Sequence, residues 1–227
     1  GHLLDPGMGA GVLSSPYHPR WELNTAPAHV DGVDRSHLSR LMGATALTLS
    51  GQSNTSHARD FLNLEPDDLQ RDIGGLVCNP PYTSGDALPK EYKDQMNARL
   101  EETTGIDISA RSALYTYFLY HSRSFLSSGD HAAYLTPDSF LTTEYGTQLK
   151  QFLLDEFVLN ALVQFDPEGE SVFEDAQVTA LISFVEATTD DPDGVTRFIR
   201  VDESIDSSTL REAVQSGDEG ETDWGFI

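Results

Sequence analysis

The chain has 227 residues, of which 37 are Asp or Glu and only 14 are Lys or Arg, giving a formal net charge of −23. No apolar run reaches the roughly 18 residues that a membrane-spanning helix needs, and no basic-then-apolar signal pattern opens the chain. We therefore expect a soluble, cytoplasmic protein without a membrane partner, and the single cysteine, Cys78, excludes an intrachain disulfide.

The acidic residues are spread along the whole chain, and only three residues are lysine. Scattered acids with scarce lysine predict a halophilic surface that stays hydrated in high salt, the alternative being an ordinary acidic protein. Such a surface repels nucleic acid. Because the screening length falls to about 3 Å in molar salt, a nucleic-acid substrate is still compatible with this charge. We expect part of the nucleic-acid binding surface to lie outside this chain.

Strand-like and helix-like segments alternate along the first two thirds of the chain. We expect strands at 2–5, 29–34, 55–61, 74–79 and 131–137, and helices at 36–47, 109–126 and 143–157. This alternation predicts an α/β fold with a Rossmann-like, doubly wound, mostly parallel sheet. Residues 83–108 are polar and only weakly helical near 91–101, so we expect a mobile excursion there.

Two long strand patterns, 158–165 and 177–187, close this part of the chain. The link between them is short, which suits an antiparallel hairpin better than a helical crossover. The fold class is therefore expected to include a C-terminal antiparallel hairpin. Residues 188–227 are expected to form a peripheral strand, an acidic tail or a linker.

Four polar residues stand at or just past the carboxyl ends of predicted strands: Asp5, Asp34, Asp60 and Asn79. In doubly wound sheets the ligand binds outside these ends, so we expect the four side chains on one rim.

The first predicted strand runs into the turn Asp5-Pro6-x-x-Gly9-x-Gly11. The glycines allow the backbone to approach a ligand closely, although a tight strand-to-helix turn without a ligand would look the same. Asp5 would repel a dinucleotide pyrophosphate and attract a cation. S-adenosylmethionine carries a sulfonium and an ammonium group and no phosphate.

Two further acids suit the rest of that cofactor. Asp34 follows the second predicted strand, where an acid can accept from ribose hydroxyls, or it is a helix N-cap. Asp31 competes for this role but lies mid-strand and should face elsewhere. Asp60 could accept from the amine of the cofactor's adenine while Phe61 packs on the ring, unless Phe61 is plain core.

The fourth predicted strand ends in Asn79-Pro80-Pro81-Tyr82. Proline cannot donate to a sheet ladder, so the strand stops there and the Pro80 carbonyl stays free. The Asn79 side-chain oxygen and that carbonyl are two acceptors suited to one NH₂ group. Tyr82 offers a face on which a planar ring can stack.

These features describe an aromatic amine as substrate. The exocyclic nitrogen of adenine is a poor nucleophile because its lone pair is delocalised, and two acceptors would localise that lone pair for attack on a methyl group. Positioning and electrostatics supply the rate, with no metal and no covalent enzyme nucleophile. A base inside a duplex must first flip out.

With both motifs in hand, the chain resembles the S-adenosylmethionine-dependent N6-adenine DNA methyltransferases of restriction–modification and related phage-defence systems. The segment Asp5 to Gly11, with Pro6 and Gly7, resembles their cofactor loop, and Asn79 to Tyr82 resembles their catalytic motif. Residues 134–141 and 171–186 resemble their later sheet segments.

The resemblance implies S-adenosyl-L-methionine as cofactor and the N6 amine of adenine in double-stranded DNA as acceptor, with base flipping. It implies catalytic roles for Asn79, Pro80 and Tyr82, and substrate binding by Pro81 and Phe173. The cofactor would be bound by the following residues: Asp5, Pro6, Gly7, Gly9, Gly11, Asp34, Asp60 and Phe61.

The resemblance covers residues 1–187, which we expect to form the catalytic domain. Members of the family have a segment upstream of the cofactor loop and a large recognition domain, and neither is recognisable here. We therefore expect a catalytic-domain fragment or a shortened member, with a specificity subunit, a restriction subunit or a missing recognition domain as partner.

Alternatives remain at this stage. Asn-Pro-Pro-Tyr also occurs in methyltransferases that act on RNA bases or on glutamine side chains of release factors. A non-catalytic module that binds S-adenosylmethionine or nucleic acid is a further possibility. The predicted hairpin around Phe173 and the excursion at 83–108 favour DNA. Lys90, Lys93 and Arg99 lie in that excursion and could contact phosphates, the alternative being a solvated loop.

Overall fold

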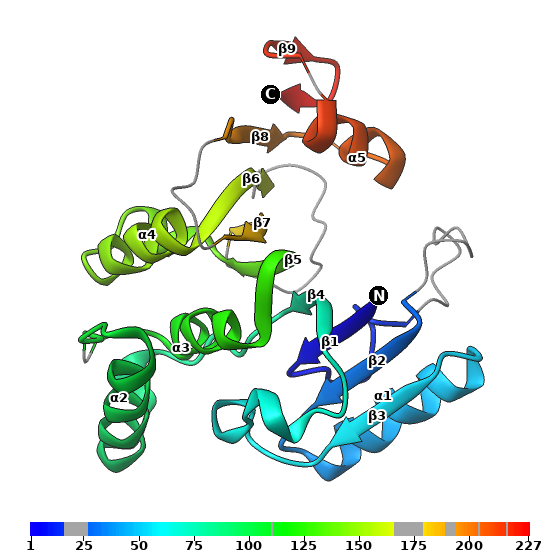
Figure 1. Ribbon diagram of the computed structural model, residues 1–227. Helices are drawn as coiled ribbons and strands as arrows, with labels where there is room; N and C mark the ends of the chain where they lie inside the picture. Colours follow the sequence, from blue (N-terminus) through cyan, green and yellow to red (C-terminus); the bar gives the residue numbers. More distant parts are fainter. Residues whose placement is uncertain (16–26, 110, 166–178, 189–193, 204, 217) are drawn as a thin grey trace.

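The computed structural model describes residues 1–15, 27–109, 111–165, 179–188, 194–203, 205–216 and 218–227. Over these residues the strands form one sheet in the order β3-β2-β1-β4-β5-β7-β6-β8-β10-β9, with helices on both of its faces (Figure 1).

The first half of the sheet is parallel. It consists of β1 (His2–Pro6), β2 (His29–Val33), β3 (Asn54–His57), β4 (Ile73–Cys78) and β5 (Leu126–Pro137). The chain moves outward from β1 to β2 and β3, and then returns to place β4 on the other side of β1. This reversal of strand order is a topological switch point, where doubly wound sheets leave a crevice beyond the strand ends.

The second half contains the closing pair. β6 (Phe157–Phe165) and β7 (Ala180–Ala187) are antiparallel, and β7 is also antiparallel to β5. The predicted doubly wound, mostly parallel sheet with an antiparallel hairpin is confirmed. The link between these strands, which contains Phe173, lies outside the described residues.

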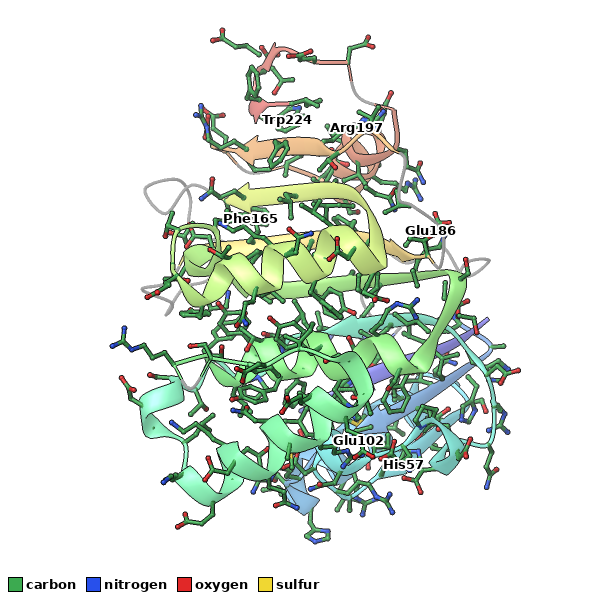
Figure 2. The ribbon with its side chains drawn as sticks, turned by 60° about the vertical axis from the view of Figure 1, so that its left-hand side comes forward. His57, Glu102, Phe165, Glu186, Arg197 and Trp224 are labelled. Atoms are coloured by element: carbon green, nitrogen blue, oxygen red, sulfur yellow. The ribbon has the colours of Figure 1, made fainter. Side chains whose placement is uncertain are left out.

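Helices cover the two faces unequally. α3 (Leu114–Ser122) and α4 (Tyr145–Glu156) pack on one face, with α2 (Lys90–Thr104) beside α3, and these three helices lie in front of the strands in Figure 2. α1 (His37–Leu49), capped by the Ser36 side chain, packs on β2 and β3. Short 3-10 helices occupy Phe61–Asn63, Pro66–Asp68, Gly85–Ala87, Arg123–Phe125 and Asp138–Leu141.

Three segments differ from the sequence-based expectation. The strand expected at 55–61 is confined to Asn54–His57, because Asp60 caps a 3-10 helix that begins at Phe61. The helix expected at 109–126 is confined to Leu114–Ser122, because residues before it run past the Asn-Pro-Pro-Tyr loop, where the Leu114 amide donates to the Thr83 carbonyl over 2.9 Å. The weakly helical excursion is a regular helix, α2, which buries Met96 and Leu100 and ends at Gly105 in the left-handed conformation.

The residues after β7 continue the same sheet. β8 (Arg197–Val201) pairs in parallel with β6, and β10 (Gly225–Phe226) pairs with both β8 and β9 (Glu221–Thr222). α5 (Ser207–Ser216) contacts β8. Trp224, labelled in Figure 2, packs on a small apolar cluster formed by β6, β8 and α5. Within the described residues no helix is long and apolar enough to cross a membrane.

The glycine turn after β1 is anchored between the sheet and α1 by one side chain. Met8 is buried above Gly32 of β2 and against Gly43 of α1, where a Cβ atom would lie 2.2 Å from the Met8 sulfur and 2.5 Å from its methyl carbon, respectively. A Cβ atom on Gly43 would also lie 3.0 Å from the Gly9 carbonyl oxygen. The absence of side chains at these positions therefore sets the position of the turn.

We predict that Gly43→Ala lowers the free energy of unfolding, as measured by urea denaturation. Overpacking costs about 1–3 kcal/mol, whereas alanine gains only about 1 kcal/mol of helix propensity. Gly74→Ala is the control, because a Cβ there meets nothing closer than 3.8 Å. Equal stability of the two variants would contradict this packing.

Candidate active site

Two turns meet at the switch point. β1 and β4 are parallel neighbours, so the turn that begins at Gly7 and the loop that begins at Asn79 leave the sheet side by side. A Cβ atom on Gly7 would lie 3.8 Å from the Asn79 carbonyl oxygen, and Gly7 has a φ of 75°. Asn79 is exposed, and its turn opens on the same side as the Gly7 turn.

A pocket of about 340 Å³ lies beside these turns. Its lining comes from the ends of β1, β2 and β4, the segment after β3, and helices α2 and α3. The lining residues are Gly7, Val33, Asp34, Arg35, Arg59, Asp60, Phe61, Asn79, Pro81, Thr83, Tyr92, Leu114 and Phe118. Three of the four residues predicted to share a rim, namely Asp34, Asp60 and Asn79, are thus brought together.

Asp34 ties the glycine turn to the start of α1. Its Oδ2 accepts from the Gly9 amide over 3.0 Å, and its Oδ1 accepts from the Ser36 amide over 2.7 Å. A carboxylate oxygen has two lone-pair sites, so each still has capacity for a ligand hydroxyl. The helix N-cap itself is Ser36. Asp31 is buried within β2, its Oδ1 lies 3.1 Å from His57 Nε2, and it does not line the pocket.

Asp60 is held from two sides. β3 ends at His57, so Asp60 caps the following 3-10 helix, where its Oδ1 accepts from the Leu62 amide over 3.1 Å. Its Oδ2 accepts from the Tyr92 hydroxyl over 2.9 Å. Burial raises the pKa of Tyr92, with the Asp60 charge adding to the rise, so Tyr92 remains a hydrogen-bond donor.

Phe61 is both core and pocket wall. It is 2% exposed, and its ring centroid lies 5.2 Å from that of Phe118 and 4.9 Å from that of His121. Both interpretations of Phe61 from the sequence are therefore compatible with its position. Leu114 and Phe118, from α3, complete an apolar wall that could support a planar ring.

Asp5 lies behind the pocket. It is 1% exposed, and it shares its sheet face with Gly32, its partner on β2, on the α1 side. Neither carboxylate oxygen makes a hydrogen bond with a described residue. The nearby Ser14 hydroxyl lowers the pKa of Asp5, although it is not in hydrogen-bonding geometry. Burial dominates and raises the pKa of Asp5 to about 7, with the Asp34 charge adding to the rise.

The rest of the glycine turn has structural contacts. Pro6 is buried, and its carbonyl accepts from the Cys78 thiol over 3.2 Å, which links the ends of β1 and β4. Gly11 has a φ of 79° and packs on Gly43. A Cβ atom added to Gly11 would lie 3.1 Å from the Gly43 Cα. Of the glycines in this turn, Gly7 lines the pocket and Gly9 is bound to Asp34.

The Asn-Pro-Pro-Tyr loop presents a mixed surface. Pro80 is buried, Pro81 lines the pocket, and no backbone N–H of the described residues donates to the Pro80 carbonyl. Tyr82 lies outside the pocket lining and is 41% exposed. Its hydroxyl donates to the Leu135 carbonyl over 3.2 Å, which fixes the ring, and burial raises its pKa to about 12.

Several pocket residues were not singled out from the sequence. Tyr92 falls in the excursion, where its spacing from the buried Met96 and Leu100 could have indicated one face of a helix. Arg99, named as a possible phosphate contact, instead pairs with Glu65 and lies 3.4 Å from the Leu64 carbonyl. Among the described residues no group of His, Cys, Asp or Glu could hold a metal ion.

The fold and the placement of the site define a class of protein. A Listeria monocytogenes protein assigned to the class I S-adenosylmethionine-dependent methyltransferases superposes with a TM-score of 0.72 at 18% identity, over 96% of this chain and 64% of that chain. The chain therefore has the fold of the class I methyltransferases.

The family follows from the sequence. The sequence model of the Eco57I restriction-modification methylase family matches residues 36–173, which is more than half of the chain, so the chain belongs to this family. Two type II methyltransferases are similar to it. M.AccI of Acinetobacter calcoaceticus is 32% identical over 51% of this chain, and M.XamI of Xanthomonas campestris pv. amaranthicola is 27% identical over 80%. The chain spans 21% and 34% of the lengths of these relatives.

We predict that Asp5 makes stability depend on pH. An unfolded aspartate titrates near pH 3.9 and the folded one near 7. The folded chain therefore binds more protons between these values, and the free energy of unfolding falls as pH rises through this window, by on the order of a few kcal/mol. Asp5→Asn should flatten that fall in urea denaturation and gain stability above pH 7. An unchanged slope would show that the carboxyl is not desolvated as described.

Proposed function

We propose that this methylase domain binds S-adenosyl-L-methionine in the pocket at the switch point and transfers its methyl group to the N6 amine of adenine in DNA. The observation that carries the proposal is the juxtaposition of the Gly7 turn with Asn79, with Asp34 and Asp60 on the same pocket. The cofactor supplies an electrophilic methyl group on a sulfonium.

The residues present fit that cofactor. Asp34 has unused acceptor capacity for the ribose hydroxyls, and its two amide donors keep the carboxylate fixed. Asp60, Phe61 and Phe118 form an acceptor beside an apolar wall, which suits adenine. Asp5 is a buried carboxyl behind the turn, without a hydrogen-bond partner among the described residues, and a cation bound near the turn would favour its ionised form, whereas a phosphate would not.

The acceptor half of the reaction is assigned to the loop after β4. The Asn79 amide oxygen and the Pro80 carbonyl accept the two hydrogens of the target amine. Drawing these hydrogens out of the ring plane localises the nitrogen lone pair for attack on the methyl group. As the nitrogen–carbon bond forms, the carbon–sulfur bond would break and its electron pair would stay on the sulfur as a neutral thioether. The methylated nitrogen would then lose one proton to the acceptors or to water, with no covalent intermediate on this chain.

The target ring is assigned to Tyr82 and Pro81. The Tyr82 hydroxyl is anchored on β5, so the ring presents a fixed face, and stacking a base on such a face contributes about 1–3 kcal/mol. Phe173 is proposed as a second contact, although it lies outside the described residues. A duplex adenine must leave the stack to reach these groups.

DNA is the proposed substrate because the chain belongs to a restriction-modification methylase family and its relatives are type II methyltransferases. The net charge of −23 makes binding to phosphate unfavourable at low salt. Recognition of the target sequence is accordingly proposed to involve a specificity subunit, a restriction subunit or a recognition domain beyond these residues.

Asn79→Ala and Asp34→Ala should fail in opposite ways. Loss of the Asn79 acceptor should abolish methyl transfer to duplex DNA, with S-adenosylmethionine affinity changed less than about threefold, because the Asn79 amide oxygen is assigned to the target amine and Asp34 and Asp60 to the cofactor. Asp34→Ala should weaken cofactor affinity about tenfold or more, since charged hydrogen bonds contribute about 1.5–3 kcal/mol. Calorimetry and tritium transfer in molar salt separate the two. Cofactor binding without transfer in the unsubstituted chain would support a binding module instead.

Tyr92→Phe tests the adenine end of the pocket. The substitution removes the hydroxyl that positions Asp60 Oδ2 and leaves only the Arg35 guanidinium, 3.7 Å away, beside that oxygen, so cofactor affinity should fall about threefold to tenfold, in line with about 1 kcal/mol for a hydrogen bond. Tyr117→Phe is the control, because its hydroxyl donates to Asn97 Oδ1, away from the pocket lining. Equal effects on affinity would argue against a role for Tyr92.

A further inference from the structure

Helix α1 is apolar on two opposite faces. On its inner face Gly43 and Leu47 are buried against Met8 and β2. Its outer face carries four large apolar side chains that are 67%, 58%, 52% and 74% exposed, respectively: Leu38, Leu41, Met42 and Leu49. A surface helix normally has one apolar stripe, and a helix that is apolar all round is normally covered all round.

The outer residues form one continuous stripe. At about 100° per residue, positions 38, 41, 42, 45 and 49 fall on the same side of the helix. Val12 and Leu13, which are 73% and 37% exposed, follow directly on Gly11, and Gly11 packs on Gly43 of α1. We call the set Val12, Leu13, Leu38, Leu41, Met42 and Leu49 the α1 outer patch.

The α1 outer patch lies in a part of the chain without acids. Residues 35–59 contain no Asp or Glu, and neither do residues 7–15, although 37 of the 227 residues are acidic. Basic residues do not replace them on α1, whose single arginine, Arg40, donates to Ser56 Oγ over 2.9 Å. An apolar surface with so little positive charge is unsuited to nucleic acid.

We propose that the α1 outer patch is the contact between two copies of this chain, packed α1 against α1 about a two-fold axis. Two chains of charge −23 repel each other wherever acids face acids, and this patch lets them approach without such pairs. A two-fold contact uses the same patch on both copies, and the ridges of leucine and methionine at spacings of three and four can interlock. The proposal is independent of methyl transfer.

This contact has a characteristic salt dependence. Added salt screens the mutual repulsion of the acidic surfaces and strengthens apolar burial when the salt is a kosmotrope such as sulfate. Association should therefore tighten as sodium sulfate is raised. An interface held by ion pairs would weaken instead.

The test is the mass of the full chain in solution, measured by light scattering and sedimentation equilibrium across protein and sulfate concentration. The unsubstituted chain should be dimeric at micromolar concentration in high salt. Leu38→Glu with Leu41→Glu should raise the dimer dissociation constant about tenfold or more, because each places a charge in the buried centre. Leu154→Glu on α4, where the leucine is 51% exposed, is the matched control and should leave the dimer intact.

A second variant gives an answer even if the double substitution perturbs folding. Thr45→Cys places an exposed thiol in the middle of the stripe, and the natural Cys78 is buried. Mild oxidation should link Thr45→Cys chains into dimers and leave Leu154→Cys chains unlinked. A chain that stays monomeric at all salt concentrations, or that links equally at both positions, overturns the proposal. If that chain still binds S-adenosylmethionine, the proposed function is unaffected.

Discussion

The close approach of two backbone turns at the ends of β1 and β4 is the constraint on which the rest of the site depends. Parallel neighbours end at the same edge, and the reversal of strand order leaves that edge uncovered by a crossover. The Gly7 turn has a φ of 75°, a conformation that favours glycine, and Met8 holds the turn against Gly32 and Gly43. A Cβ atom on Gly32 or Gly43 would collide with Met8 and so displace the turn from its position.

The acids of the pocket serve the fold and the proposed ligand at once. Asp34 joins the glycine turn to the start of α1, and Asp60 joins the segment after β3 to α2 through Tyr92. Each carboxylate is fixed by hydrogen bonds and still has acceptor capacity for a ligand. Asp5 differs from both, because it is buried without a hydrogen-bond partner among the described residues, and burial raises its pKa.

Acidic residues are frequent along the chain but are absent from two of its helices, α1 and α3. The helix α3 is buried on every side and lies in one acid-free stretch, and α1 lies in another. For α3 the reason is visible, since it is enclosed by the sheet, α2 and α4. For α1 only the inner face is enclosed, which is why its outer face points to a contact with another polypeptide surface.

The sequence by itself determined the mostly parallel character of the first half of the sheet, the closing antiparallel pair and the rim position of Asp34, Asp60 and Asn79, whereas the order of the strands comes from the structure. Local patterns specify these features, because apolar runs mark strands and glycine, proline and acids mark the places where strands end. The tertiary structure alone decided that Tyr92 enters the pocket from α2, that Leu114 and Phe118 form its wall, and that Asp5 faces away from it. These outcomes depend on how helices distant in sequence pack on the sheet, and on which face of the sheet each strand residue occupies. Local residue spacing specifies neither of them.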